Sequence, residues 1–449
     1  MASLDERLRM RAAWETVRLA ETITHAFENT EFYRELWTEQ GVSPSLFVDR
    51  SSLELFPSIR KSDFSARPRR LISKVDPPDT IRDTSGTTGV RLPVYMNAEE
   101  ERALAELRRG RSEGHPRPKV TLRILPPPRR LRPVTRQELD NATGSLVMHI
   151  LPGYDPNVWY DAVDMLISVL CEEYFVGPEL ATIDLIHTTP PPLFEYASRL
   201  MDERGIEPSR FNVKEILLTG GPLVASSRAY LAKLWNAAVV ATYSCTEVRS
   251  EAMECAANPR VYHPSPSMVA EVLDRRTGRH VGHGEAGEVA LTGLFPFQRV
   301  MPMVRYRPGD FARFFSAPCT CGSSTVGIEP LGRTQDLLDL TELPHHPRVI
   351  GTTGVFEALG PIPQVPKFPY PRAEFAKTTV DGKTSVELRI EATDPRSFAA
   401  KPVEDRILEL LLDADPDLRL LKETAEIALS VKLVPKNSLS HFFRIYPGR

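Results

Sequence analysis

The sequence predicts an α/β protein of two domains, a large one over residues 1–335 and a small α+β one over residues 336–449. Between residues 160 and 240, segments with helical apolar spacing alternate with short strand-like segments, which is typical of a largely parallel sheet. After residue 380, two segments with alternating apolar residues flank one helical segment, which indicates a small α+β domain. Asp381-Gly382, just before the first of these segments, predicts a hairpin turn. We therefore expect a large domain with mixed and parallel sheets and helices, followed by a mobile C-terminal domain.

The first predicted element is a helix over residues 4–28, whose apolar residues, including Met10 and Val17, recur every three or four positions and indicate a core-facing stripe. Two strands, at 79–84 and 92–96, flank a glycine-rich segment, and Asn97 is a suitable N-cap for the helix that follows. Further helices are expected at 158–171, 193–204, 224–235 and 402–413, and further strands at 184–187, 215–218, 237–243, 386–390 and 427–433.

Composition limits the partners of the chain. Of the 449 residues, 41% are hydrophobic and 26% are charged, which permits a sizeable core. The net charge of −3 gives no general attraction to nucleic acid or an anionic membrane. No segment approaches the roughly 20 apolar residues of a membrane span, and the N-terminus lacks the apolar run of a secretory signal. We expect a cytoplasmic protein that acts on small molecules and binds neither nucleic acid nor membrane.

The most informative segment follows the strand predicted at 79–84. Its glycines allow close approach of the backbone to a ligand, and its hydroxyls and backbone N–H groups can bind phosphate. It is not a Walker A loop, because it lacks Gly-Lys-Ser/Thr and precedes a strand rather than a helix. By itself such a segment is more often an ordinary turn. Its residues are Thr84, Ser85, Gly86, Thr87, Thr88 and Gly89.

Four more segments follow this loop in a fixed order, at 219–223, 242–247, 303–310 and 331–336. The series resembles the adenylate-forming superfamily of acyl-CoA synthetases, luciferases and peptide-synthetase adenylation domains. The segments Glu31–Leu36 and Leu55–Lys61 make it similar to the phenylacetate–CoA ligase branch. The resemblance extends from about residue 25 to the C-terminus and is weakest in 105–150 and 340–375.

The resemblance implies that ATP and Mg²⁺ are cofactors. It implies that the Thr84–Gly89 loop holds the triphosphate, with Thr88 among the catalytic residues. The other nucleotide contacts that it implies are Gly220, Gly221 and Pro222 along the adenine, Tyr243 packed against it, and Ser244 and Thr246 beside it.

Three further residues carry the charges that the implied reaction needs. Glu247 would hold Mg²⁺, Asp310 would accept hydrogen bonds from the ribose hydroxyls, and Arg333 would reach the ribose or a phosphate. Outside the ordered series, Asp310 and Arg333 would be interpreted as a solvated loop residue and a surface ion pair. In the implied reaction a carboxylate attacks the α-phosphorus and pyrophosphate leaves, with positioning and charge neutralisation supplying most of the stabilisation.

The C-terminal region departs from the family pattern. The related ligases have a catalytic lysine near the C-terminus, and that position falls here at His441 or a neighbouring phenylalanine. Histidine is only partly protonated near neutral pH. Lys436, five residues earlier, is the other candidate. In the hinge, Gln335 replaces the first acidic residue of the family pattern and Asp336 is retained.

These departures leave three functional hypotheses open. The first is a ligase that activates an aryl acid and transfers it to CoA. The second is an adenylate-forming enzyme with an amine acceptor that forms an amide or a nitrogen–nitrogen bond, in one variant by activating nitrite. The third is a nucleotide-binding protein without catalysis, against which the retained Glu247, Asp310 and Arg333 argue. A homodimer is possible, since dimers are common in the branch.

Four residues have the composition of a Cys₃His zinc site: Cys255, His263, Cys319 and Cys321. The resemblance supports a structural zinc ion, and the alternative is reduced side chains without metal. Cys171 and Cys245 are predicted to be buried thiols. The acid is expected to lie near Met148–Ile150 and His187–Thr189, where His149 and His187 are more often structural residues than ligands.

Overall fold

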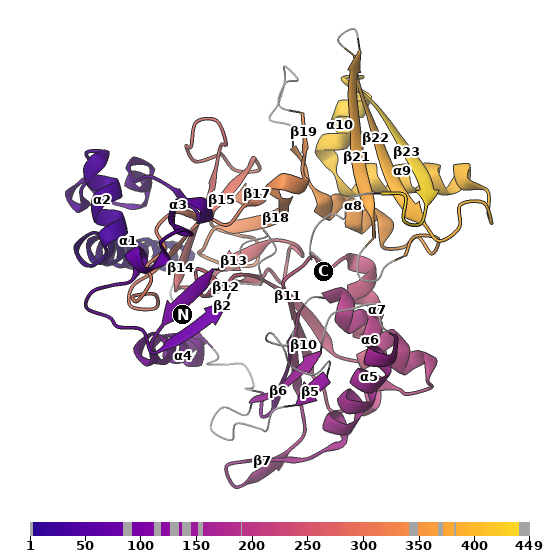
Figure 1. Ribbon diagram of the computed structural model, residues 1–449, viewed down its shortest axis with the longest axis horizontal. Coiled ribbons are helices and arrows are strands. Elements are labelled where there is room, and N and C mark those ends of the chain that lie inside the picture. Colours follow the sequence, from indigo (N-terminus) through magenta and orange to yellow (C-terminus); the bar gives the residue numbers. More distant parts are fainter. Residues whose placement is uncertain are drawn as a thin grey trace. The chain divides into compact units, whose positions relative to one another are not determined.

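The computed structural model describes residues 3–83, 92–111, 118–125, 134–136, 145–150, 156–189, 191–340, 349–366, 371–380 and 383–439. The chain divides into two compact units (Figure 1). The first unit comprises Met1–His115 and Tyr243–Leu337, and the second comprises Pro116–Thr242 and Leu338–Arg449. The predicted division into domains 1–335 and 336–449 stays a prediction.

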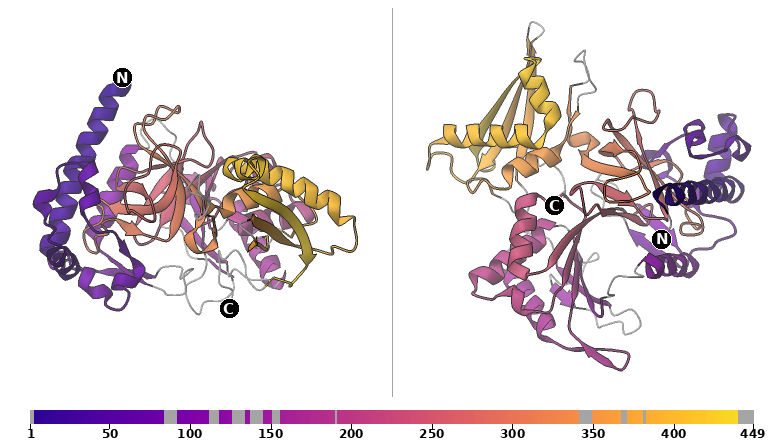
Figure 2. Two further views of the ribbon diagram at one scale, coloured as in Figure 1. Left: turned by 90° about the horizontal axis from the view of Figure 1, so that it is seen from above. Right: turned by 180° about the vertical axis from the view of Figure 1, so that it is seen from behind.

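The first unit begins with the long helix α1, Leu4–Asn29, followed directly by α2, Glu31–Glu39 (Figure 2). Thr30 separates them, because its hydroxyl donates to the Ala26 carbonyl of α1 and accepts from the Tyr33 N–H of α2. The predicted stripe of α1 is partly wrong, since Met10 and Val17 are exposed. The buried face of the helix carries polar residues as well as apolar ones, namely Glu15, Leu19, Thr22, Ile23, His25 and Ala26.

The sheet of the first unit is mostly antiparallel and runs in the order β1-β16-β15-β17-β18-β13-β12, with β14 paired to β15. One parallel pair, β1 with β16, joins residues far apart in the sequence. The bounds of these strands are Ile59–Arg60 (β1), Ser250–Glu254 (β12), Tyr262–Pro264 (β13), Met268–Leu273 (β14), Ala286–Gly293 (β15), Tyr306–Arg307 (β16), Asp310–Phe315 (β17) and Gly327–Arg333 (β18).

The remaining elements of the first unit surround the glycine-rich segment. The strands β2, Thr80–Asp83, and β3, Pro93–Met96, form an antiparallel pair, as predicted. Asn97 accepts from the Glu100 N–H at the start of α4, Ala98–Arg111, so the predicted N-cap is confirmed. The short helix α3, Lys61–Phe64, begins directly after β1.

The second unit contains the predicted parallel sheet. Strands β10 and β11 are parallel, as are β9 and β10, β4 and β9, and β4 and β6, while β5 is antiparallel to β6. Figure 1 shows the helices α5, α6 and α7 together on one side of these strands. The bounds are Thr121–Leu125 (β4), Val134–Arg136 (β5), Ser145–Ile150 (β6), Pro156–Cys171 (α5), Tyr174–Val176 (β7), Glu179–Ala181 (β8), Leu185–Thr188 (β9), Pro191–Glu203 (α6), Glu215–Thr219 (β10), Ala225–Trp235 (α7) and Ala238–Cys245 (β11).

The C-terminal part of the second unit has its own core. Strands β21, β22 and β23 form a sheet in which β21 is antiparallel and β23 parallel to β22. The predicted hairpin pairing is confirmed, because Val380 pairs with Lys383. The turn residues Asp381 and Gly382 lie outside the described residues. The bounds are Leu338–Asp339 (β19), Val349–Ile350 (β20), Thr352–Leu359 (α8), Ala373–Val380 (β21), Lys383–Ala392 (β22), Ala400–Ala414 (α9), Pro416–Glu423 (α10) and Ile427–Pro435 (β23).

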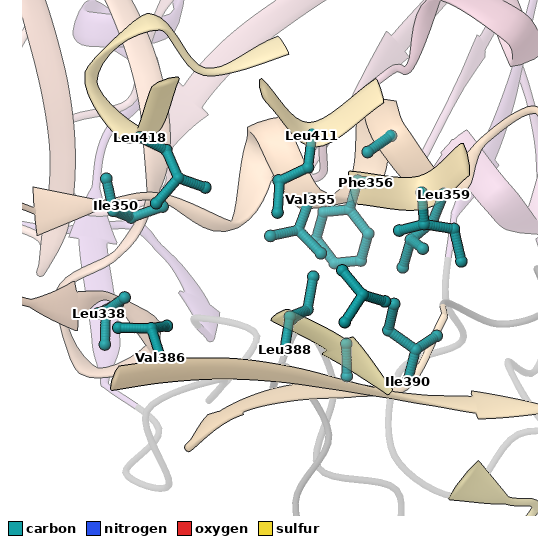
Figure 3. Packing of buried hydrophobic residues seen from close by; sticks show 14 of the residues in the cluster. Leu338, Ile350, Val355, Phe356, Leu359, Val386, Leu388, Ile390, Leu411 and Leu418 are labelled. Carbon is teal, nitrogen blue, oxygen red and sulfur yellow. The ribbon is translucent and has the colours of Figure 1, made fainter. Parts of the chain in front are cut away.

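Helices and sheet enclose this core between them (Figure 3). Val355, Phe356 and Leu359 point from α8 and Leu411 points from α9 toward the strand residues, of which Leu388 is fully buried. Every fully buried residue of the cluster lies between residues 338 and 433, so this segment has an apolar core that its own residues supply.

None of the helices in the described part of the chain combines the length and the apolar character that a bilayer crossing requires.

We expect Leu388→Ala to destabilise the C-terminal core by about 2–5 kcal/mol, because it leaves a cavity where Leu388 has no exposed surface. Hydrogen exchange of the 383–392 peptide measures this local effect without requiring the whole chain to unfold in one step. The matched control is Leu420→Ala on α10, which removes a 44% exposed side chain and should change the stability by about 0.5 kcal/mol or less. Equal effects of the two substitutions would contradict the description of this core.

Candidate active site

Three of the predicted site residues meet at the ends of β11, β17 and β18 in the first unit. Asp310 and Arg333 are paired across β17 and β18, and Arg333 Nη1 lies 3.0 Å from Asp310 Oδ1. The same guanidinium nitrogen donates to the Pro308 carbonyl at 3.0 Å. The Tyr243 hydroxyl donates to the other carboxylate oxygen, Asp310 Oδ2, at 2.7 Å. The charge of Asp310 raises the pKa of Arg333, so the guanidinium stays charged.

Glu247 lies in the same unit with three donors around its carboxylate. The Tyr306 hydroxyl donates to Oε1 at 3.1 Å, and the Cys245 thiol donates to Oε2 at 3.3 Å. The Lys61 ammonium lies 3.8 Å from Oε1. A carboxylate offers about four acceptor sites, so two hydrogen bonds leave lone pairs for a hard cation such as Mg²⁺. The residues present therefore fit the magnesium that the family implies.

Burial keeps the thiol and the two phenols at this site protonated. It raises the pKa of Cys245 well above the ordinary value, and nearby Glu247 raises it further. It likewise raises the pKa of Tyr243 and Tyr306, with carboxylates adding to the shift in both cases. All three groups are hydrogen-bond donors at neutral pH.

Lys61 and Tyr306 were missed as site residues in the sequence. Burial lowers the pKa of Lys61, and the charge of Glu247 opposes this shift. The available signal was that Lys61 is the only lysine of the Leu55–Lys61 segment and that Tyr306 belongs to the 303–310 segment. Nothing local in the sequence indicates that both contact Glu247.

A buried carboxylate fixes the strands that carry Lys61 and Tyr306. Arg60 precedes Lys61 and pairs with Arg307, which follows Tyr306, across the parallel strands β1 and β16. Both arginines bind Glu288, which has no exposed surface: Arg60 contacts both carboxylate oxygens, and Arg307 Nη1 lies 3.2 Å from Oε2. One buried carboxylate thus anchors the backbone on either side of the site.

Arg305, on the other side of Tyr306, is held in a backbone conformation that is uncommon for a side-chain-bearing residue, with φ of +51°. Its guanidinium binds the buried Glu271 at 3.1–3.2 Å and donates to the Phe56 carbonyl at 2.6 Å. These contacts offset the cost of this backbone conformation. They also hold the backbone next to Tyr306 in place.

The turn that carries Glu247 is anchored in the same manner. Arg249 binds Glu100, which is fully buried and also accepts from two backbone N–H groups of the 299–300 segment. Gln298 Nε2 donates to the backbone carbonyl of Glu247 at 2.7 Å. Removal of Arg249 would leave an uncompensated buried charge, which is strongly destabilising.

Not all predicted residues join this site. Thr84–Gly89 and His441 lie outside the described residues. Ser244, in β11, and Thr246, in the turn that follows this strand, are both exposed. Lys436 is exposed in the turn that follows β23, in the second unit. Its role, like those of the loop and His441, stays a prediction.

Gly220, Gly221 and Pro222 follow β10 in the second unit. Gly220 has a φ of +78°, and a Cβ there would lie 2.3 Å from Thr189 Oγ1, so a side chain is excluded. Thr188 is the last residue of β9 and Thr189 follows it; their predicted role on the acid side of the site stays a prediction. They line a small hollow whose other walls are apolar: Ile124, Leu125, Leu193, Phe194 and Ala197.

The four predicted zinc ligands lie together in the first unit, with their ligand atoms within 4.8 Å of one another. Cys255 Sγ is 3.7 Å from Cys319 Sγ, and Cys321 Sγ is 3.4 Å from His263 Nε2. Tetrahedral zinc with Zn–S of about 2.3 Å and Zn–N of about 2.0–2.1 Å places its ligand atoms roughly 3.5–3.8 Å apart. The observed separations fit these values.

The surroundings of the four residues also suit a metal. His263 Nδ1 lies 3.0 Å from the Val326 carbonyl, which favours a proton on Nδ1 and leaves the Nε2 lone pair free for coordination. Asn258 directs its backbone N–H at Cys255 Sγ and its side-chain amide at Cys319 Sγ, at 3.3 and 3.5 Å. The cluster could therefore hold zinc.

The prediction for the other two cysteines was half right. Cys245 is buried, but Cys171 is exposed at the last position of α5. The apolar character of α5 suggested burial, whereas the end of a helix is where its buried face meets solvent.

Comparison with known proteins finds phenylacetate–coenzyme A ligases as relatives in sequence. No protein-family model matches the chain. The chain is 24% identical over 455 residues to a phenylacetate–coenzyme A ligase of Thermus thermophilus, covering 96% of this chain and 93% of that enzyme. A phenylacetate–coenzyme A ligase of Escherichia coli is also 24% identical, over 75% of this chain and 73% of that enzyme.

Solved structures show the same fold. A 2-hydroxyisobutyryl-CoA ligase in its postadenylation state matches with a TM-score of 0.67 at 17% identity, over 98% of this chain and 89% of that one. ATP-bound MatB from Rhodopseudomonas palustris matches with a TM-score of 0.51 at 16% identity, over 81% and 66%.

The ordered segments and these relatives make the chain similar to the AMP-forming ligases of the adenylate-forming superfamily, and the solved structures show the same fold. Within the superfamily it is phenylacetate–CoA ligase-like, since the sequence similarity to those enzymes extends along nearly the whole chain.

Proposed function

We propose that the chain activates a small aryl carboxylic acid with ATP as an acyl-adenylate and then transfers the acyl group to CoA. The observation that carries the proposal is the cluster of Glu247, Asp310, Arg333 and Lys61, which combines two carboxylates and two cations within one unit. Asp310 would offer its remaining lone pairs to the ribose hydroxyls, and the Arg333 guanidinium lies beside it. Glu247 would hold Mg²⁺, which would neutralise phosphate charge.

The first step is substitution at phosphorus. An oxygen of the acid attacks the α-phosphorus, the bond to the bridging oxygen breaks, and pyrophosphate leaves with the electron pair. The proteins whose names support this chemistry include the phenylacetate–coenzyme A ligases and a 2-hydroxyisobutyryl-CoA ligase in complex with an acyl-AMP. The residues of this chain bind and orient the nucleotide, and no covalent intermediate on the protein is needed.

The acid is assigned to the region at the carboxyl ends of β4 and β9, whose small hollow must widen to admit an aryl acid. Phe194, Leu193 and Leu125 give it an apolar wall, and Thr188 and Thr189 add two hydroxyls at its rim. An apolar pocket with few polar groups suits an aromatic ring better than a strongly polar acid. CoA is assigned as the acceptor because the relatives are CoA ligases, including one solved with CoA bound.

We expect the wild-type enzyme to exchange labelled pyrophosphate into ATP with an aryl acid such as phenylacetate, and Glu247→Gln to lower that rate about 100-fold because it weakens the metal carboxylate. The control Glu39→Gln removes an exposed carboxylate at the end of α2 and should leave the rate unchanged. Product analysis with CoA and with amines then identifies the acceptor. Exchange followed by amide formation alone would replace CoA with an amine acceptor. Absence of exchange with every acid, nitrite included, would reject catalysis.

We further propose that Lys61 supplies a cation to the phosphates. It lies 3.8 Å from the proposed metal carboxylate, in the unit that also carries Asp310 and Arg333. The usual C-terminal lysine is replaced in this sequence, so a cation from the N-terminal region would reduce the need for it.

We expect Lys61→Met to lower the exchange rate about 10- to 100-fold, because it removes one charge from the transition state while keeping the length of the side chain. Lys436→Met and His441→Ala, assayed beside it, show whether the C-terminal candidates matter more. Lys74→Met, at an exposed position, is the matched control. A larger loss at Lys436 or His441 than at Lys61 would overturn this assignment.

We also propose that Cys255, His263, Cys319 and Cys321 hold one structural zinc ion. We expect protein purified without chelator to contain about one zinc per chain, and Cys321→Ser to reduce the content below half, because three ligands bind more weakly than four. Cys171→Ser, at an exposed cysteine of the other unit, should keep the full metal content. Wild-type protein with less than about half an equivalent of zinc would contradict the site.

A further inference from the structure

Two segments of the active site have the same internal spacing. Tyr243 precedes Glu247 by four residues, and Tyr306 precedes Asp310 by four residues. The hydrogen bonds do not follow this spacing. The Tyr243 hydroxyl donates to Asp310, and the Tyr306 hydroxyl donates to Glu247. The tyrosine of each segment thus donates a hydrogen bond to the carboxylate of the other segment.

We propose that Tyr243 and Tyr306 are reciprocal positioning residues: Tyr306 orients Glu247 for the metal, and Tyr243 orients Asp310 for the nucleotide. The inference rests on the proposed function, which assigns the two carboxylates to Mg²⁺ and to the ribose. It adds that the two ligand contacts depend on separate hydroxyls, each supplied by the opposite segment.

Competing cations make this orientation necessary. Lys61 lies 3.8 Å from Glu247 Oε1, and Arg333 lies 3.0 Å from Asp310 Oδ1. Without the Tyr306 hydroxyl, Glu247 Oε1 would be free to turn toward Lys61, while the Cys245 thiol still holds Oε2. Without the Tyr243 hydroxyl, Asp310 would keep its contact with Arg333 but lose the bond that fixes Oδ2. A hydrogen bond from Tyr306 to Oε1 occupies the oxygen nearest to Lys61, and the bond from Tyr243 fixes the oxygen of Asp310 that Arg333 does not hold. The remaining lone pairs of each carboxylate are then directed at the ligand.

The two hydroxyls stay protonated, so both can donate a hydrogen bond throughout the assay range of pH. Burial and nearby carboxylates raise the pKa of both tyrosines, so neither ionises in an ordinary assay. The Tyr306 ring also packs against Phe64, with ring centroids 5.9 Å apart. Phenylalanine preserves this packing and removes only the hydroxyl, so the substitution isolates the hydrogen bond.

The test uses the full-length wild-type enzyme, Tyr306→Phe and Tyr243→Phe. Two constants are measured for each: the free Mg²⁺ concentration that gives half-maximal ATP–pyrophosphate exchange, and the Kd for AMP without added divalent metal. We expect Tyr306→Phe to raise the Mg²⁺ constant about tenfold, since hydrogen bonds to charged groups are among the stronger ones, with the AMP Kd changed less than about threefold. We expect Tyr243→Phe to raise the AMP Kd about tenfold and to leave the Mg²⁺ constant within about threefold.

A third variant separates positioning from general loss of a buried hydroxyl. Tyr174 is buried in the second unit, and its hydroxyl donates to the Val169 carbonyl at 2.8 Å. Tyr174→Phe should change neither constant. Each effect should also be the same at pH 6.5 and pH 8.5, because the hydroxyls do not titrate in that range.

The crossed assignment is overturned if each tyrosine affects the ligand of its own segment, if both variants shift both constants alike, or if neither constant moves. The proposed function fails separately, when the wild-type enzyme shows no exchange with any acid. In that case AMP binding by the wild-type and Tyr243→Phe proteins still decides the pairing of Tyr243 with Asp310.

Discussion

A carboxylate removed from water must have its oxygens satisfied, and the first unit contains several such groups, among them Glu100, Glu271 and Glu288. Their arginine partners are neighbours of the site residues in sequence, so each ion pair fixes a backbone position next to the chemistry. Breaking one such pair leaves an uncompensated charge in the interior, which is more costly than the loss of a surface contact. The geometry around Glu247 and Tyr306 therefore depends on residues that never face the ligand.

The fold could be predicted well where a local pattern is sufficient. Alternating helical and strand-like segments predicted the parallel strands β9, β10 and β11 with their helices. The hairpin turn at Asp381-Gly382 predicted the pairing of β21 with β22. The strand order of the mainly antiparallel sheet in the first unit was not predicted. This sheet pairs strands that are far apart in the sequence, such as β1 and β16.

The sequence predicted the site residues that belong to the ordered series of family segments. It did not predict the buried ion pairs that hold these segments in place. The family segments predicted Glu247, Asp310 and Arg333, and cysteine and histidine chemistry together with the resemblance suggested the four residues that cluster around Cys319. The buried ion pairs bring together residues separated by 149 and 228 positions, and no local periodicity encodes such a contact. Exposure was also missed at two positions: Cys171 at the end of α5 and Met10 within α1 are apolar by type, yet both are exposed to solvent.

The crossed hydrogen bonds constrain how this sequence can be recombined. A chimera with a relative whose junction falls between residues 247 and 303 would take Tyr243 and Glu247 from one parent and Tyr306 and Asp310 from the other. Both cross-segment contacts would then be formed between side chains that were never selected together, even if each segment were intact. The two segments should therefore be exchanged together. A library that exchanges both should retain more active members than one that exchanges either alone.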